Sequence, residues 1–363
     1  MSLRDWLVAG AILVAVLTLV PMNWPRLESL PAGPNARIPY ERGNDYWLFD
    51  QFSRQEAAAG KVLLVGDSVV WGHYVSSDEA LSGQLNRRAG ANRFANLGVD
   101  GIHPMAMEGL IRYYGPGIEG RSVMLHCNLL WMSSPRHDLR ERKAFAFNHP
   151  RLVPQLVPWI ECYDEGVAGR LAVAVGRELP SSRLAYHWQT ACFGGKDIPS
   201  WTLDHPYENP LARIARPPAV GGSSGPAPGA TQETWEQRQL GPMAAQWVNL
   251  DESFQWAAFQ RAAGLLRGRG NRLFVVVGPF NEHMLTGAAL EAYRRQVAGV
   301  EAWLAREGIP HWVAPALPRQ EYADASHPLA AGYDRMALQL LSDKSFAAFA
   351  SVEPLRPPEG NSR

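Results

Sequence analysis

Short, continuous apolar runs bounded by glycine or proline recur along the chain, and they limit the fold more than any other feature. Such runs occupy 61–65, 93–97, 122–126, 273–277 and, more weakly, 311–314. Runs of this length without polar alternation are typical of strands buried on both faces of a parallel sheet. Helical patterns lie between several of them, at 79–89, 253–266 and 288–307. This alternation predicts an α/β fold, a three-layer α/β/α sandwich around a central parallel sheet.

The third and fourth runs are separated by about 150 residues, whereas a βαβ unit needs only about 30. We therefore expect a large insertion at about 135–250, within a domain that extends over 46–350. The insertion contains an apolar stretch at 152–160, a helical pattern at 166–178 and a Pro/Gly/Ser-rich segment at 216–229. The last of these is predicted to be a mobile loop, and residues 351–363 a disordered tail.

Tryptophan is abundant, with thirteen residues in the chain. Those in or beside the insertion either pack its core, which is the interpretation we favour, or stack on sugar rings. They are Trp159, Trp188, Trp201, Trp235, Trp247 and Trp256.

The amino-terminal segment differs from the rest of the chain. Trp6 to Val20 carries no charge, and continuing to Trp24 gives an uncharged stretch close to the roughly 20 residues that span a bilayer core. No small-x-small cleavage pattern follows directly, so residues 1–24 are predicted to be a retained signal anchor or transmembrane helix rather than a removed signal peptide. Residues 25–45, rich in proline and glycine, are predicted to tether an extracytoplasmic domain to the membrane, although the flanking charges determine the orientation poorly.

Composition excludes several classes of function. Thirty-five basic residues balance thirty-five acidic ones, which argues against a nucleic-acid partner.

The three cysteines form neither a disulfide framework nor a zinc pattern, so we expect no metal. A bridge between Cys162 and Cys192 is allowed outside the cytoplasm, and Cys127 is predicted to be a small buried hydrophobe. No Walker or dinucleotide glycine pattern follows the first run, so no cofactor is expected.

Ser68 directly follows the first predicted strand, so its side chain should emerge at the carboxyl end of a parallel strand, where open α/β sheets place their sites. A serine nucleophile needs a general base oriented by a carboxylate. His327 and Asp324 lie three positions apart on the loop before a helical pattern at 329–341, and both can face the same direction. We therefore predict a catalytic set of Ser68, His327 and Asp324.

Acyl transfer also needs donors that stabilise an oxyanion. Gly101 follows the second predicted strand and can present its backbone N–H, while Asn128 ends the third and can offer a side-chain amide. With the backbone N–H of Ser68, these residues form the predicted oxyanion hole. Further residues at strand ends are predicted to line a substrate pocket, with structural roles as the alternative; they are Asp67, Trp71, His73, Asn281 and His283.

These blocks resemble the SGNH, or GDSL-type, hydrolase family. The signature consists of a Gly-Asp-Ser after the first strand, a glycine, an asparagine and a carboxyl-terminal Asp-x-x-His, and all four appear here in order, over about 46–133 and 251–345. The resemblance implies the roles given above for Ser68, Gly101, Asn128, Asp324 and His327. The third block departs from the family, which commonly has Gly-x-Asn-Asp where this chain has His-Cys-Asn-Leu, and this indicates a divergent membrane-anchored branch.

The resulting expectation is a membrane-anchored serine esterase or O-acyltransferase. It would act through an acyl-Ser68 intermediate on short acyl groups of an extracytoplasmic carbohydrate or polymer. The alternative is a non-catalytic binding or scaffold protein of an envelope polysaccharide system that has kept the fold. The sequence alone does not distinguish hydrolysis from transfer, and it does not give the oligomeric state.

Overall fold

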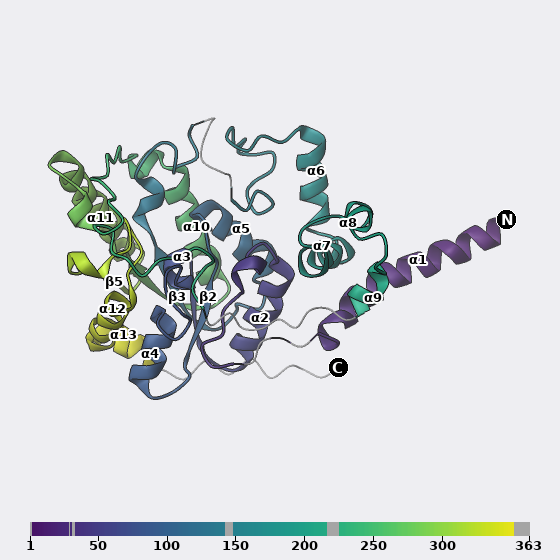
Figure 1. Ribbon diagram of the computed structural model, residues 1–363, viewed down its shortest axis with the longest axis horizontal. Helices are drawn as coiled ribbons and strands as arrows, with labels where there is room; N and C mark the ends of the chain where they lie inside the picture. Colours follow the sequence, from purple (N-terminus) through teal and green to yellow (C-terminus); the bar gives the residue numbers. More distant parts are fainter. Residues whose placement is uncertain (1, 29, 31–32, 142–147, 216–224, 352–363) are drawn as a thin grey trace.

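The computed structural model describes residues 2–28, 30, 33–141, 148–215 and 225–351 (Figure 1). Within these ranges, five strands form one parallel sheet in the order β2-β1-β3-β4-β5. The strands are β1 (Val62–Gly66), β2 (Phe94–Gly98), β3 (Ser122–Cys127), β4 (Arg272–Val277) and β5 (His311–Val313). Each apolar run that predicted a strand forms one, which confirms the α/β class. Positions 216–224 of the predicted loop and 352–363 of the predicted tail lie outside the described residues.

Helices flank the sheet, and alternate side chains of its strands enter two separate cores. Leu63 and Val65 of β1 pack in the first core, whereas Val62 and Leu64 pack in the second. The first core is shared with α2 (Tyr46–Ala58), α5 (Pro104–Tyr114), α10 (Phe254–Gly268) and α11 (Ala288–Arg306). The second is shared with α4 (Leu81–Ala89), α12 (Ala330–Ser342) and α13 (Lys344–Ser351). Burial on both sides explains why the strand runs carry no polar alternation.

The helical patterns between the strands match the structure closely, except at the start of α4. The pattern predicted a helix from residue 79, but α4 begins at Leu81. Glu79 instead closes a turn, because its carboxylate accepts hydrogen bonds from the backbone N–H of Ser76 at 3.1 Å and the Ser76 hydroxyl at 2.8 Å.

The long connection between β3 and β4 carries several helices of its own. They are η3 (Leu129–Met132), α6 (Val167–Gly176), α7 (Pro180–Phe193), α8 (Ile198–Asp204), α9 (Pro210–Ala215) and η4 (Leu250–Glu252), followed by α10. The pattern at 166–178 is α6, whereas the apolar stretch at 152–160 forms turns and no helix or strand. Figure 1 shows α6 to α9 gathered on the side of the molecule from which α1 extends.

The tryptophans of this connection are mainly packing residues. Trp201, Trp235 and Trp256 are buried, whereas Trp159 is 48% exposed and lies 3.7 Å beneath the guanidinium of Arg170. All three cysteines are buried and free. Cys127 is thus the small buried hydrophobe that was predicted, and the bridge that the sequence allows between Cys162 and Cys192 is not formed.

The helix α1 (Leu3–Asn23) is long and apolar enough to cross a bilayer. The continuous helical stretch Leu3–Arg26, which includes η1 (Trp24–Arg26), is 24 residues long, and only 6% of its most apolar window is buried in the protein. Its amino terminus is defined by a capping box, in which the side chains of Ser2 and Asp5 each bond the other residue's backbone N–H. Sequence and structure therefore agree on one exposed apolar helix at this end of the chain.

The segment predicted as a tether is partly packed into the domain. After η1, the ring of Trp188 on α7 meets Trp24 edge-on at 5.0 Å. Arg37 and Ile38, just before η2 (Tyr40–Arg42), are buried. The second half of the segment 25–45 is therefore not a free spacer, because its few large side chains pack into the domain.

His187 of α7 joins the segment after η1 to the start of α2. Its Nδ1 lies 3.0 Å from the carboxylate of Asp45, and its Nε2 forms an ion-pair contact of 2.9 Å with Glu28. Asp45 also accepts from Arg42 and caps the first turn of α2 through the N–H of Leu48. Burial opposes a charge on His187, but the two carboxylates outweigh it and raise the pKa of the imidazole from 6.5 to about 9.

This cluster should make stability depend on pH. Because the folded-state pKa of His187 lies above its unfolded value, its contribution is complete below pH 6.5 and is lost as the pH rises through about 9. The free energy of unfolding of full-length protein in detergent should be larger than that of a His187→Gln variant. This gap should be about 3 kcal/mol wider at pH 6 than at pH 9.5. Urea titration at both pH values measures this difference, and a constant gap would contradict the charged pair.

Candidate active site

Ser68 lies where β1 ends and the short helix α3 (Ser68–Trp71) begins. Asp67 is the N-cap of α3, and its side chain accepts a hydrogen bond from the backbone N–H of Val69 at 3.0 Å. Two glycines allow this helix to sit tightly against the sheet. A Cβ on Gly66 would approach Val70 Cγ2 to 2.5 Å, and one on Gly98 would approach the backbone nitrogen of Trp71 to 2.3 Å. The strand ends therefore fix the place of Ser68.

The loop between η6 (Arg319–Glu321) and α12 is shaped by Asp324. Its Oδ1 accepts the backbone N–H groups of Ser326 and His327, each at 3.0 Å. Asn281, after β4, supports the same loop by donating from Nδ2 to the Asp324 carbonyl at 3.1 Å and from its backbone N–H to Ala325 at 2.8 Å. The carboxylate and the imidazole are thus held on one rigid turn.

The structure brings Ser68, His327 and Asp324 into one hydrogen-bonded chain. His327 Nδ1 lies 2.8 Å from Oδ1 and 2.9 Å from Oδ2 of Asp324, and its Nε2 lies 2.8 Å from Ser68 Oγ. A carboxylate can only accept, so Nδ1 carries the proton and Nε2 is free to accept the Ser68 hydroxyl. The predicted serine, base and orienting carboxylate meet in the geometry that serine activation requires.

Electrostatics favours the same assignment of protons. Burial opposes ionisation of Asp324, but His327 and two backbone N–H groups outweigh it and hold the pKa of this carboxyl well below its usual range. Burial also opposes a charge on His327, whereas Asp324, with smaller effects from Asp67 and Asp100, raises its pKa above 6.5. Asp324 is therefore ionised at neutral pH, and it increases the basicity of His327.

Asp67 forms a second buried centre directly beneath Ser68. Besides the N–H of Val69, its carboxylate accepts from Asn128 Nδ2 at 2.7 Å and Trp131 Nε1 at 2.9 Å, and it contacts His126 Nδ1 at 3.1 Å. The other nitrogen of His126 lies 2.8 Å from the carbonyl oxygen of Gly278. Burial opposes ionisation of Asp67, but these partners, led by His126, lower its pKa to about 2. This centre joins the ends of β1, β3 and β4.

A segment of the long β3–β4 connection crosses the candidate site. Arg238 donates to the hydroxyl of Tyr74 at 2.8 Å and to the carbonyl of Ala323 at 2.9 Å. Tyr74 in turn donates to Asp324 Oδ2 at 3.1 Å, and its ring meets His327 edge-on at 5.5 Å. Sequence reasoning missed both residues. Tyr74 lies close enough to Ser68 to be suspected, but nothing in the sequence around Arg238 connects it with Asp324.

The predicted oxyanion donors Gly101 and Asn128 differ in their conformations and hydrogen bonds. Gly101 has a φ of 71°, a backbone conformation that favours glycine, and its carbonyl accepts a hydrogen bond from Asn148 at 3.4 Å. Asn128 donates to Asp67 and accepts from the N–H of Leu130 at 3.0 Å. Asn128 is therefore at the strand end as expected, but one of its amide hydrogens is already used, and its role toward an oxyanion stays a prediction.

Several of the residues that were predicted to line a pocket make structural contacts. Asp67, Trp71 and Asn281 are all but fully buried, and their part in a substrate pocket stays a prediction. Trp71 donates to the Ile38 carbonyl at 2.7 Å and is covered by the guanidinium of Arg37 at 3.7 Å. His283 is exposed and bonds the carbonyl of Leu317.

His73, one of the predicted pocket residues, has its ring next to the imidazole of His327. The two ring centroids lie 5.6 Å apart. His73 is partly exposed, and its Nδ1 pairs with Asp100 at 2.6 Å.

Within the described part of the chain, no group of three or more His, Cys, Asp or Glu side chains is arranged to hold a metal ion. The contacts of Ser68, His327 and Asp324 place a hydroxyl beside a base and an orienting carboxylate. Comparison with known proteins adds no relative, since no protein-family model matches the chain and no curated protein matches it.

Proposed function

We propose that the protein is a membrane-anchored serine esterase or O-acyltransferase of the SGNH type. The observation that carries the proposal is the hydrogen-bonded chain from Ser68 Oγ through His327 to Asp324, with donor–acceptor distances of 2.8 Å on both sides of the imidazole. The nucleophile follows the first strand and the base lies on the loop before a late helix, as the family resemblance implies. A three-layer α/β/α arrangement accounts for the two cores on opposite sides of the sheet.

The geometry supports a double displacement. Ser68 Oγ attacks the carbonyl carbon of an acyl ester while its proton passes to His327 Nε2, which gives a tetrahedral oxyanion. When this intermediate collapses, the alcohol leaves with the proton from Nε2, and the acyl group remains as an ester of Ser68. Water or a carbohydrate hydroxyl then attacks the acyl-enzyme and gives its proton to Nε2. The bond between the acyl group and Ser68 Oγ breaks, Oγ takes the proton from Nε2, and the acid or the new ester leaves.

The backbone N–H of Ser68 at the start of α3 is the proposed first oxyanion donor, with Gly101 and Asn128 as the others. Each such donor typically contributes on the order of 100-fold to 1000-fold in rate. In this proposal α1 anchors the protein in the membrane, and the domain faces the extracytoplasmic side. The substrate is an acylated small molecule or carbohydrate.

A fluorophosphonate probe tests the nucleophile directly. We expect covalent labelling of the wild type and none of a Ser68→Ala variant, because the probe phosphonylates an activated serine hydroxyl. Absence of labelling in the folded wild type, or equal labelling of both proteins, would favour the non-catalytic scaffold. Product analysis with added oligosaccharide separates transfer from hydrolysis: new sugar esters indicate transfer, and free acid alone indicates hydrolysis.

The rate of ester hydrolysis should rise with pH. Only the neutral imidazole of His327 can accept the serine proton, and its pKa lies above 6.5 because Asp324 stabilises the charged form. A plot of kcat/KM against pH for p-nitrophenyl acetate, corrected for spontaneous hydrolysis, should therefore increase to a plateau with its midpoint above 6.5. A midpoint below 6.5 would show that His327 is not the base or that Asp324 does not raise its pKa.

A further inference from the structure

Exposed apolar side chains are concentrated in one part of the domain. Outside the amino-terminal stretch 3–27, every exposed large hydrophobic side chain among the described residues except Tyr40 and Leu338 lies between Leu156 and Leu211. This segment belongs to the long connection between β3 and β4 and contains α6 to α9. Single exposed hydrophobic residues need no explanation, whereas a group of them indicates a surface that contacts another molecule or a membrane.

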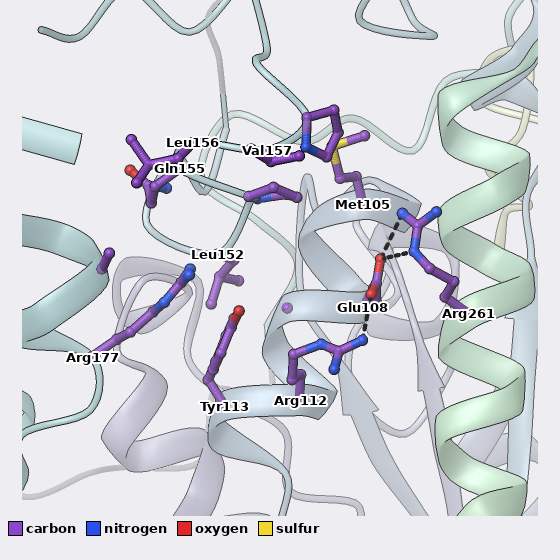
Figure 2. Close-up of a pocket in the computed structure, with 14 residues that line it drawn as sticks. Met105, Glu108, Arg112, Tyr113, Leu152, Gln155, Leu156, Val157, Arg177 and Arg261 are labelled. Carbon is purple, nitrogen blue, oxygen red and sulfur yellow. Dashed lines mark hydrogen bonds and ion pairs between the residues drawn. The ribbon is translucent and has the colours of Figure 1, made fainter. Parts of the chain in front are cut away.

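Leu156 and Val157 belong to a separate feature of this segment. Figure 2 shows them on a turn beside α5, where they line a cavity together with Tyr113 and Arg177. Most of the other exposed apolar side chains lie on α6 or around α8 and α9. On α6 they recur at every fourth position and form one stripe, which consists of Val167, Leu171 and Val175.

The most exposed apolar side chains outside this cavity and α1 surround α8 and α9. Leu203 in α8 is 83% exposed, Tyr207 between the two helices is 100% exposed, and Leu211 in α9 is 72% exposed. Ile198, at the start of α8, is 41% exposed. These four residues are named the α8–α9 surface below.

The inner faces of α8 and α9 are already packed. Cys192 and Phe193 of α7 form a small buried cluster with Trp201 of α8, and Ile214 of α9 packs against it. This cluster is separate from the two cores on the sheet. The residues of the α8–α9 surface take no part in it, so the domain itself does not cover them.

The helix α7 connects this unit to α1. It packs against α1, and its Trp188 meets Trp24 edge-on at 5.0 Å, while Pro21 in the last turn of α1 is buried. The 21 residues of α1 rise about 32 Å, close to the roughly 30 Å of a bilayer core, so a spanning α1 places Trp24 at the membrane boundary. The helices packed on α7 then lie near the same boundary (Figure 1).

We propose that the α8–α9 surface docks on the lipid bilayer that α1 crosses. The proposal rests on the membrane anchor of the proposed function and adds a second contact with lipid. Apolar side chains of interfacial segments enter the boundary between headgroups and acyl chains to a depth of about 5–10 Å. A single helix leaves a domain free to tilt, whereas two contacts fix its orientation and the direction from which a substrate reaches Ser68.

The charges of this region favour a neutral lipid surface. Residues 196–215 carry two basic and three acidic side chains. Lys196 pairs with Asp204 at 2.6 Å, and Arg213 contacts Glu208 at 3.8 Å. The region therefore has no excess of positive charge that would attract anionic lipids. Burial of apolar side chains is the attraction that remains, and it needs no anionic lipid.

Fluorescence quenching in lipid nanodiscs tests the contact. Full-length protein with Leu203→Cys or Tyr207→Cys is labelled with the fluorophore NBD and reconstituted in phosphatidylcholine, with or without a doxyl group near the headgroup end of the acyl chain. The three native cysteines are buried, and wild-type protein measures background labelling. We expect the doxyl lipid to lower the fluorescence at both positions at least about twofold, because the side chains lie at that depth.

Two further positions provide controls. Leu338 is 50% exposed on α12, on the side of the domain opposite α1 (Figure 1), so the fluorescence of labelled Leu338→Cys should not change. Val14 lies in the middle of α1, so labelled Val14→Cys should be quenched by a doxyl group deep in the bilayer.

A charged substitution tests whether the contact is apolar. In the labelled Tyr207→Cys protein, Leu203→Glu should reduce the quenching at least about twofold, because a charged side chain is costly to move out of water. Leu338→Glu in the same protein should leave the quenching unchanged.

Quenching at Val14→Cys without quenching at Leu203→Cys and Tyr207→Cys would overturn the docking and leave the anchor in place. Blue-shifted emission at these two positions without quenching would show that protein covers the surface, which would also overturn the proposal. Absence of quenching at Val14→Cys would remove the anchor and the docking together. None of these measurements needs turnover, so their outcome is independent of the fluorophosphonate test of Ser68.

Discussion

Replacing Ser68 by alanine is expected to lower kcat for a short acyl ester about 10,000-fold or more, while KM changes little. The substitution removes the hydroxyl that is hydrogen-bonded to His327 Nε2, so the proposed acyl-enzyme could not form. Residual turnover would come from oxyanion stabilisation and binding alone. Burst kinetics with p-nitrophenyl acetate measure the change, since the wild type should show acyl-enzyme accumulation and the variant none.

A matched control is Ser82→Ala. Ser82 lies in α4, is fully buried and has a hydroxyl without a partner among the described residues, so its removal should leave kcat within about twofold of the wild type. If Ser68→Ala retained a tenth or more of the wild-type rate, the reaction would not proceed through Ser68.

Replacing Asp67 by alanine should cause the largest loss of stability among the site substitutions, about 3–5 kcal/mol in free energy of unfolding. The change leaves the buried donors of Asn128, Trp131 and Val69, together with His126, without their common acceptor. Thermal unfolding in detergent should show a melting temperature lower by about 10 °C.

Asp334→Asn provides the comparison for this substitution. Asp334 is paired with the guanidinium groups of Arg87 and Arg88, but its side chain is 37% exposed. Exposed pairs contribute about 0–1 kcal/mol, so the melting temperature should hardly change. Similar losses for both aspartates would show that burial of Asp67 is not what makes its contacts important.

The sheet could be predicted from the sequence because burial on both faces leaves a strong local signal. The runs at β1 to β5 needed no partner to be recognised, and the positions of Ser68 and His327 followed from strand ends and a three-residue spacing. The helix starts were less secure. Before α4, hydrogen bonds between Ser76 and Glu79 form a turn in place of the first predicted helical residues. A hydrophobic pattern does not reveal these hydrogen bonds.

The sequence did not reveal the structural contacts of the residues that were predicted to line a pocket. Trp71 and Asn281 lie at strand ends, where ligands commonly bind, but strand ends also need polar side chains and aromatic rings to fasten the loops together. Here Asn281 holds the Asp324 loop and Trp71 holds residues 37–38. Arg238 was not predicted as a site residue. Its contact with Tyr74 joins positions that are 164 apart, and no spacing rule connects them.

Ser68 and His327 are separated by 259 positions in the chain. The hydroxyl of Ser68 lies near the start of the domain, but it gains its proton acceptor only when the loop before α12 closes onto the finished sheet. A growing or partly folded chain thus carries an ordinary, unreactive serine. In the proposed mechanism, activity would require complete folding, and a truncation before His327 would leave Ser68 without its proton acceptor.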